Sequence, residues 1–183
     1  MPKFNDEIFI SVDIEADGPL VGVHSMLSIG AVNVADPTKT FYAELKPISE
    51  EFIPDALAVS GLDRDKLKRD GKDPAAAMTE LTAWVKTFKG RPVFCSFSTW
   101  DWSYVYWYLI RYTGRSPFGH SSLDMKSFYI ARFGTTWGET IKRKIAEQRP
   151  QLLEGLGPHT HNALDDAKEQ GELFRRMMAA PPS

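Results

Sequence analysis

The stretch Ile8–Pro19 reads IFISVDIEADGP and decides the fold of this 183-residue chain. Aliphatic residues recur at every second position from Ile8 to Ile14, which predicts a β-strand with one aliphatic face. The same alternation sends the side chains of Asp13 and Glu15 to the other face, where both carboxylates point the same way. A divalent cation between them is the simplest compensation for their repulsion, and an edge strand with two solvated acids is the alternative.

The composition is that of an ordinary globular protein. At 43% hydrophobic and 25% charged residues the chain can bury a proper core, and we expect a single domain over residues 1–183. The one cysteine, Cys95, excludes an internal disulfide and a cysteine-rich zinc site. No apolar run approaches the roughly 20 residues that span a bilayer, and the first residues lack the apolar core of a signal peptide. A cytoplasmic protein is therefore expected.

The charge pattern limits the kind of partner. The net charge is −2, which argues against a general polyanion-binding surface. Basic residues cluster at 64–69 and at 142–144, and solvated helix faces are the expected explanation for both clusters. If nucleic acid binds, we expect it to be held over a few nucleotides rather than along a duplex.

The remaining pattern predicts one α/β fold. Further strands are expected at 26–34, 40–45 and 91–97, so the chain opens with a three-stranded antiparallel meander. The acidic strand is expected to be central in the sheet because its inward face is wholly aliphatic. Helices are expected at about 74–88, 101–112, 122–133, 136–148 and 162–178. Residues 46–73 are expected to be irregular because prolines and glycines interrupt them.

Two further segments carry acids that can join Asp13 and Glu15. Asp101 begins the helix after the fourth strand, where an acid is often only a partner of the helix dipole. In this order of elements, however, the end of the fourth strand lies beside the acidic strand. His161 and Asp166 are five residues apart at the start of the last helix and face one side. An imidazole can accept a proton near neutral pH, so His161 is the candidate base.

Together these residues predict a metal site. Four carboxylates without cysteine suit Mg²⁺ or Mn²⁺ rather than zinc, and they are those of Asp13, Glu15, Asp101 and Asp166. Such an all-carboxylate site typically holds two ions roughly 3.5–4 Å apart, which suits in-line attack on a phosphodiester.

Three motifs in this order resemble the DEDDh group of 3′–5′ exonucleases, which includes ribonuclease T, oligoribonuclease and DNA polymerase proofreading subunits. The motifs are Asp13-Ile14-Glu15, Trp100-Asp101 and the segment HNALDD that ends at Asp166. The resemblance covers nearly the whole chain. It implies a ribonuclease H-like fold, with a mixed five-stranded sheet flanked by helices.

The resemblance also implies roles for the site residues. The four carboxylates would bind two divalent cations, Mg²⁺ or Mn²⁺, and Asp13 would contact both. His161 would be the general base for the water that attacks the last phosphodiester and releases a nucleoside 5′-monophosphate. Relatives without this histidine use a tyrosine four residues before the last acid, where this chain has Asn162. Single-stranded 3′ ends are the expected substrate, with RNA slightly favoured over DNA, and a homodimer is expected from the resemblance alone.

The second motif departs from the family pattern. Many relatives have Asn-Ala-x-Phe-Asp where this chain has FSTWD, which puts the usual contact of that asparagine in doubt but not the metal ligand. The aromatic run that follows, DWSYVYWY, is similar to a branch of small bacterial exoribonuclease-like proteins. Most of its rings are expected in the core, but Trp100 is predicted to lie near the substrate. Stacking on a terminal base there is worth about 1–3 kcal/mol.

Other functions remain as alternatives. A metal-dependent hydrolase of small phosphoesters or nucleotides would use the same site. A catalytically inactive nucleic-acid-binding domain is disfavoured because all four acids and the histidine are present. A zinc site at His159 and His161 is disfavoured because the other two histidines are distant in sequence. An EF-hand is rejected because its twelfth position is His24 instead of a glutamate, and no glycine-rich phosphate loop indicates an NTPase.

Overall fold

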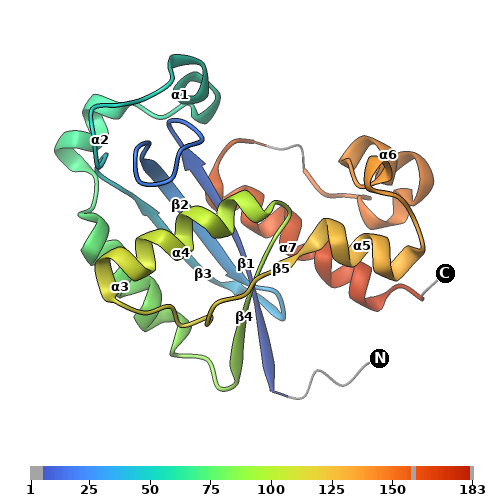
Figure 1. Ribbon diagram of the computed structural model, residues 1–183. Helices are drawn as coiled ribbons and strands as arrows, with labels where there is room; N and C mark the ends of the chain where they lie inside the picture. Colours follow the sequence, from blue (N-terminus) through green and yellow to red (C-terminus); the bar gives the residue numbers. More distant parts are fainter. Residues whose placement is uncertain (1–5, 158–159, 182–183) are drawn as a thin grey trace.

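The computed structural model describes residues 6–157 and 160–181, and Figure 1 shows their arrangement. The strands are β1 (Glu7–Ala16), β2 (Met26–Asn33), β3 (Asp36–Glu44), β4 (Arg91–Ser96) and β5 (Leu123–Asp124). The α-helices are α1 (Pro54–Ser60), α2 (Arg64–Asp70), α3 (Pro74–Val85), α4 (Thr99–Thr113), α5 (Met125–Phe133), α6 (Lys142–Gln148) and α7 (Ala163–Ala179). Two short 3₁₀ helices are η1 (Trp137–Glu139) and η2 (Pro150–Leu152).

The strands form one mixed sheet in the order β3-β2-β1-β4-β5. β1 pairs antiparallel with β2 and parallel with β4, so the acidic strand is central, as the sequence predicts. A parallel partner requires a crossover connection, and the helices between β3 and β4 provide it. The mixed five-stranded sheet with flanking helices is the ribonuclease H-like architecture that the resemblance implies.

Different helices pack on the two faces of the sheet. Ile10, Val12 and Ile14 are buried in a core shared with α3 and α4, which lie on one face in Figure 1. The predicted aromatic packing is confirmed there, because Tyr104 and Tyr108 of α4 are fully buried. α7 packs on the other face, against β1 and β2. Consequently the face of β1 that carries the acids looks toward α7.

A glycine sets how closely α7 approaches the sheet. Gly30 of β2 stands opposite Asp13 in the register, and a Cβ on it would lie 2.2 Å from the carbonyl oxygen of Ala163. No other residue fits at that distance, because a real Cβ does not come within 3.0 Å of backbone atoms. The first turn of α7 therefore rests directly beside Asp13.

The prediction that residues 46–73 are irregular is wrong, because they contain α1 and α2. The residues taken as interruptions are helix boundaries. Pro54 occupies the first turn of α1, where a missing N–H costs nothing, and Gly61 ends that helix at a φ of 64°. Asp63 caps α2 by accepting a hydrogen bond from the N–H of Lys66 at 2.9 Å.

Other boundaries shift by a few residues. The β2–β3 turn comes earlier than predicted, because the side chain of Asn33 accepts from the N–H groups of Ala35 and Asp36 and starts β3 at once. The helix predicted at 122–133 begins only at Met125, after the two-residue strand β5. The helix predicted at 136–148 is η1 followed by α6. Across the described residues, no helix combines the length and apolar composition that a membrane span requires.

Candidate active site

The predicted site residues converge on one cavity of about 580 Å³. It lies where β1 and β4 end and where α4 and α7 begin. Its lining includes every site residue that the sequence singles out, namely Asp13, Glu15, Trp100, Asp101, His161 and Asp166. Segments as far apart in sequence as Asp13 and Asp166 thus meet in one place, because a central strand and two helix starts share one edge of the sheet.

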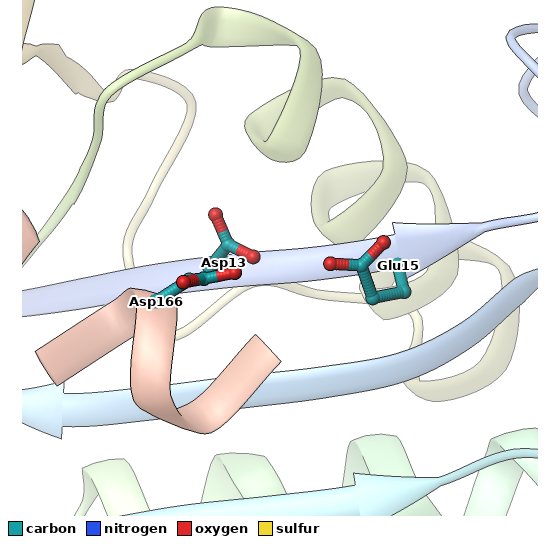
Figure 2. Close-up of side chains that lie close together, drawn as sticks. All are labelled: Asp13, Glu15 and Asp166. Carbon is teal, nitrogen blue, oxygen red and sulfur yellow. The ribbon is translucent and has the colours of Figure 1, made fainter. Parts of the chain in front are cut away.

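Three of the carboxylates form a tight group. Carboxylate oxygens of Asp13, Glu15 and Asp166 all lie within 4.8 Å of one another. Figure 2 shows Asp13 and Glu15 side by side on β1, with Asp166 reaching up from the first turns of α7. Asp165, the next acid in sequence, is exposed and points away, as the helical spacing predicts. In the described part of the chain this is the one such group of three or more potential ligands.

Asp101 lines the same cavity but is not part of this tight group. It sits in the first turn of α4, whose start is fixed by Ser98, because the Ser98 side chain accepts from the N–H of Trp100 at 3.2 Å. The Asp101 side chain is buried and close enough to Asp13 for their charges to interact. The predicted role as helix-dipole partner alone does not explain a buried acid that faces another acid.

The acids repel one another strongly. Burial is the largest cause that raises the pKa of the Asp13 carboxyl well above its ordinary value, and the charges of Asp101, Glu15 and Asp166 raise it further. Burial, followed by the charges of Asp166 and Asp101, raises the pKa of Glu15 to about 8. Burial raises the pKa of Asp101 to about 7, although three backbone hydrogen bonds lower it. Bound cations would remove this penalty, so the donor set fits hard divalent metal ions.

His161 stands at the mouth of the site. It is exposed, lines the cavity and has a φ of 55°, in the left-handed region that non-glycine residues rarely occupy. Asn162 immediately after it caps α7 by accepting from Leu164 and Asp165. The N–H of Thr160, on its other side, donates to a carboxylate oxygen of Asp166 at 3.0 Å. The loop that carries the imidazole is therefore tied to a predicted metal ligand. The zinc alternative involves His159, which lies outside the described residues.

Three residues on this cavity, Lys142, Glu169 and Gln170, were not assigned to the site from the sequence, which placed Lys142 on a solvated helix face. Lys142 of α6 lines it, forms an ion pair with Glu169 and lowers the pKa of Asp13. Gln170 is buried and joins two strands: its amide N donates to the carbonyl of Val12 at 2.9 Å, and its amide O accepts from the N–H of Phe97 at 2.8 Å. For Glu169 and Gln170 a signal was present in the sequence, because they follow Asp166 by three and four positions and so share its helix face.

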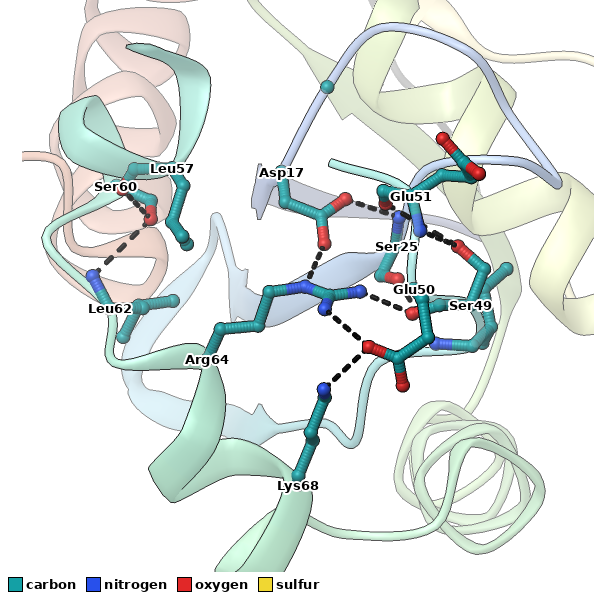
Figure 3. A network of polar contacts seen from close by, with 12 residues as sticks. Asp17, Ser25, Ser49, Glu50, Glu51, Leu57, Ser60, Leu62, Arg64 and Lys68 are labelled. Carbon is teal, nitrogen blue, oxygen red and sulfur yellow. Dashed lines mark hydrogen bonds and ion pairs between the residues drawn. The ribbon is translucent and has the colours of Figure 1, made fainter. Parts of the chain in front are cut away.

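A buried ion pair holds the wall formed by α1. The guanidinium of Arg64 donates to Asp17 at 2.9 Å, and both side chains are almost fully buried. Figure 3 shows this guanidinium also reaching the carbonyl of Ser49 and the carboxylate of Glu50. Asp17 accepts in addition from the N–H of Ser25 at 2.6 Å. The network fixes the segment before α1 against the end of β1.

That wall is apolar and belongs to the cavity. Ala56 and Val59 of α1 line it, together with Pro19 after β1 and Trp100 of α4. Trp100 is 37% exposed, and its ring packs edge-on against Tyr104 with centroids 5.0 Å apart. The cavity thus has an acidic floor and apolar sides, a combination that suits a phosphodiester with an attached base.

Fold and site together define the class: a ribonuclease H-like nuclease with the DEDDh set of acids and histidine. The chain is 43% identical over 180 residues to the 3′–5′ DNA exonuclease Cap18 of Escherichia coli, covering 94% of this chain and 92% of that protein. No family model matches the chain. The chain belongs to the DEDDh 3′–5′ exonucleases, and it is an enzyme that acts on nucleic acid from the 3′ end.

Solved structures agree on the fold. The nuclease domain of 3′hExo, a DEDDh family member bound to rAMP, matches with a TM-score of 0.77 at 17% identity, over 96% of this chain and 94% of that one. Pop2p of S. pombe, in an Mg²⁺- and Mn²⁺-bound form, matches with 0.56 at 15% identity, over 93% and 82%. Exonuclease I of E. coli, in complex with a dT13 oligonucleotide, matches with 0.64 at 14% identity, over 94% and 41%.

Proposed function

We propose that this enzyme removes nucleoside 5′-monophosphates from the 3′ end of single-stranded DNA with the help of two divalent cations, Mg²⁺ or Mn²⁺. The observation that carries the proposal is the convergence of four acids on one cavity, three of them with oxygens within 4.8 Å of one another. The metal-bound form of Pop2p supports the choice of cations.

The roles follow from the positions of the residues. Asp13, Glu15, Asp101 and Asp166 would hold the cations, with Asp13 at the centre of the group. Cations held there would polarise the scissile phosphate and favour attack by water at neutral pH. His161, at the mouth of the cavity, would accept the proton of the attacking water. Lys142, whose charge already acts on Asp13, would lie near the negative charge that develops on the phosphate.

The apolar sides of the cavity would hold the terminal base. Trp100 and Val59 are both exposed and both line the cavity, so a base between them would bury apolar surface that is otherwise exposed to solvent. Base stacking on an aromatic ring is worth about 1–3 kcal/mol and tolerates any sequence. This supports the predicted substrate contact of Trp100.

The preference for DNA departs from the slight preference for RNA expected from the sequence. It rests on the relative at 43% identity, which is a DNA exonuclease. Exonuclease I bound to dT13 shows that this fold accepts single-stranded DNA in another member. The rAMP in 3′hExo shows equally that it accepts a ribonucleotide, so the distinction needs a direct test.

The test is a competition between two strands in one tube. Matched 5′-labelled single strands of DNA and RNA, with different dyes, are incubated with enzyme and Mg²⁺, Mn²⁺ or EDTA. Asp101→Asn protein controls for contaminating nuclease. We expect the DNA strand to shorten faster in either metal and neither strand to shorten in EDTA or with the variant. Faster loss of the RNA strand would overturn the DNA preference and leave the exonuclease activity in place.

A further inference from the structure

From the edge of the cavity, a strip of two half-buried residues and one exposed tryptophan continues away from the acids. It consists of Phe97, Lys126 and Trp137, and we call it the aromatic–lysine strip. Phe97 follows β4 and lines the cavity, Lys126 is in the first turn of α5, and Trp137 begins η1. In Figure 1 α5 and α6 lie to one side of the sheet, and α5 packs beside the C-terminal part of α7. The strip therefore leads from the site toward that side.

The contacts within the strip are continuous. The ammonium of Lys126 lies 5.1 Å from the ring centroid of Phe97 and 5.5 Å from that of Trp137. Lys142 lies 5.6 Å from the Phe97 centroid on the cavity side. The two rings are thus at most about 11 Å apart, which is about three steps of a stacked strand at ~3.4 Å each.

The charge of Lys126 contacts two aromatic rings but is not neutralised by an acid. Lys142 is paired with Glu169, and Arg143 and Lys144 share Glu147. Lys126, by contrast, forms no ion pair with an acid anywhere in residues 6–157 and 160–181. An ammonium held between two ring faces without a carboxylate keeps its attraction for an external anion.

Among the described residues, Trp137 has the most exposed large apolar side chain, at 61%, yet its backbone is held firmly. Glu139 closes a capping box with Thr136, accepting from its N–H at 3.1 Å, and is held in turn by Gln148 at 2.8 Å. Thr140 is buried and donates to the carbonyl of Trp137 from both its N–H and its hydroxyl. A ring presented on a fixed backbone loses little freedom when a ligand stacks on it.

We propose that the aromatic–lysine strip binds the nucleotides immediately 5′ of the terminal one, with bases on Phe97 and Trp137 and one phosphate of the backbone that connects them on Lys126. This inference rests on the proposed function, because it extends the same substrate out of the same cavity. An alternation of cation and aromatic ring is the arrangement that grips single strands without sequence preference. A chain with net charge −2 can hold a polyanion in this way only along a short track.

Equilibrium binding measurements distinguish base stacking on Trp137 from the ionic contact of Lys126 with a phosphate. A 5′-fluorescein DNA strand of 12 nucleotides is titrated with protein in EDTA, which prevents turnover, at several salt concentrations. Trp137→Ala should weaken binding about tenfold, the equivalent of about 1.4 kcal/mol of stacking, with an unchanged salt slope. Trp137→Phe should restore most of the affinity. Lys126→Gln should reduce the slope of log K against log salt by about 0.7, the value for one phosphate contact in a single strand.

A matched control variant and a second substrate separate failure of the strip from failure of the proposed function. Lys39→Gln changes an exposed lysine on the opposite edge strand and should alter neither affinity nor slope. With metal present, kcat/KM of Trp137→Ala should fall at least fivefold more on the 12-nucleotide strand than on a dinucleotide. Equal binding by Trp137→Ala and wild type would overturn the proposal for the strip. A different oligomeric state of Trp137→Ala in light scattering would also overturn it, because Trp137 would then contact another copy of the chain rather than DNA. A wild-type protein that binds DNA through the strip but degrades no strand would overturn the proposed function instead.

Discussion

Neutralising one acid of the cavity should make the metal-free protein more stable. Glu15 is only 9% exposed, and its pKa rises from 4.5 to about 8 because of burial and then the charges of Asp166 and Asp101. The pKa in the folded protein thus exceeds that of the unfolded chain. The contribution of this carboxyl to stability is fully present below about pH 4.5 and is lost as the pH rises toward 8.

Glu15→Gln removes this pH-dependent loss, because the amide has nearly the same shape and no charge. A rise in pKa from 4.5 to about 8 corresponds to at most about 5 kcal/mol, at about 1.4 kcal/mol for each tenfold change in proton affinity. Solvent screens part of this effect at a carboxyl on a cavity wall, so we expect the free energy of unfolding in EDTA to increase by about 2 kcal/mol at pH 8. For a chain of this length that raises Tm by about 4–8 °C. The difference in stability between the variant and wild type should shrink as the pH falls toward 4.5, below which the wild-type carboxyl is protonated in both the folded and the unfolded state.

Thermal unfolding in EDTA between pH 5 and pH 8 measures this, with Glu51→Gln, an exposed glutamate, as the control. Addition of Mg²⁺ or Mn²⁺ should make wild type the more stable of the two proteins. A cation that binds only the folded state stabilises it, and the variant has lost one carboxylate that would hold the cation. A variant that is less stable than wild type at pH 8 in EDTA would refute the reasoning. So would a difference between the two proteins that grows as the pH falls.

Three further predictions concern the base, the ion pair and the helix contact. His161→Gln should lower kcat by about 10²–10⁴-fold with little change in KM, and a steady-state assay that finds equal kcat would remove the base assignment. Arg64→Met should cost about 3–5 kcal/mol in chemical denaturation because it leaves Asp17 buried and unpaired, and adding Asp17→Asn should recover part of the loss. Gly30→Ala should cost about 1–3 kcal/mol and reduce Mn²⁺ affinity, since a Cβ there collides with α7. Gly157→Ala, where a Cβ meets open space, should change neither quantity.

The acids could be predicted from the sequence because each lies at a position that local rules determine. Alternation places Asp13 and Glu15 on one face of a strand, and a cap places Asp166 one turn into a helix. The aliphatic face of β1 also favours its central position, which the pairing with β2 and β4 confirms. The roles of these residues in metal binding and of His161 in catalysis stay predictions until they are tested.

The features that could not be predicted depend on long-range contacts. The pair of Asp17 and Arg64 is 47 positions apart, and nothing local marks either residue as buried. β5 is only two residues long and exists because β4 lies beside it. Prolines and glycines around α1 and α2 were taken as interruptions because a seven-residue helix is too short to show a periodic pattern.

The central claim is that the acids around Asp13 form a metal-dependent centre that shortens nucleic acid from its 3′ end. The most direct measurement is a time course on a 5′-labelled single strand of DNA, with Mn²⁺ or EDTA, for wild type and Asp13→Asn. We predict a ladder that shortens by single nucleotides while the label stays on the longest remaining fragment, only with metal and only in wild type. Immediate release of a labelled mononucleotide, internal fragments, or undiminished activity of Asp13→Asn would contradict the claim.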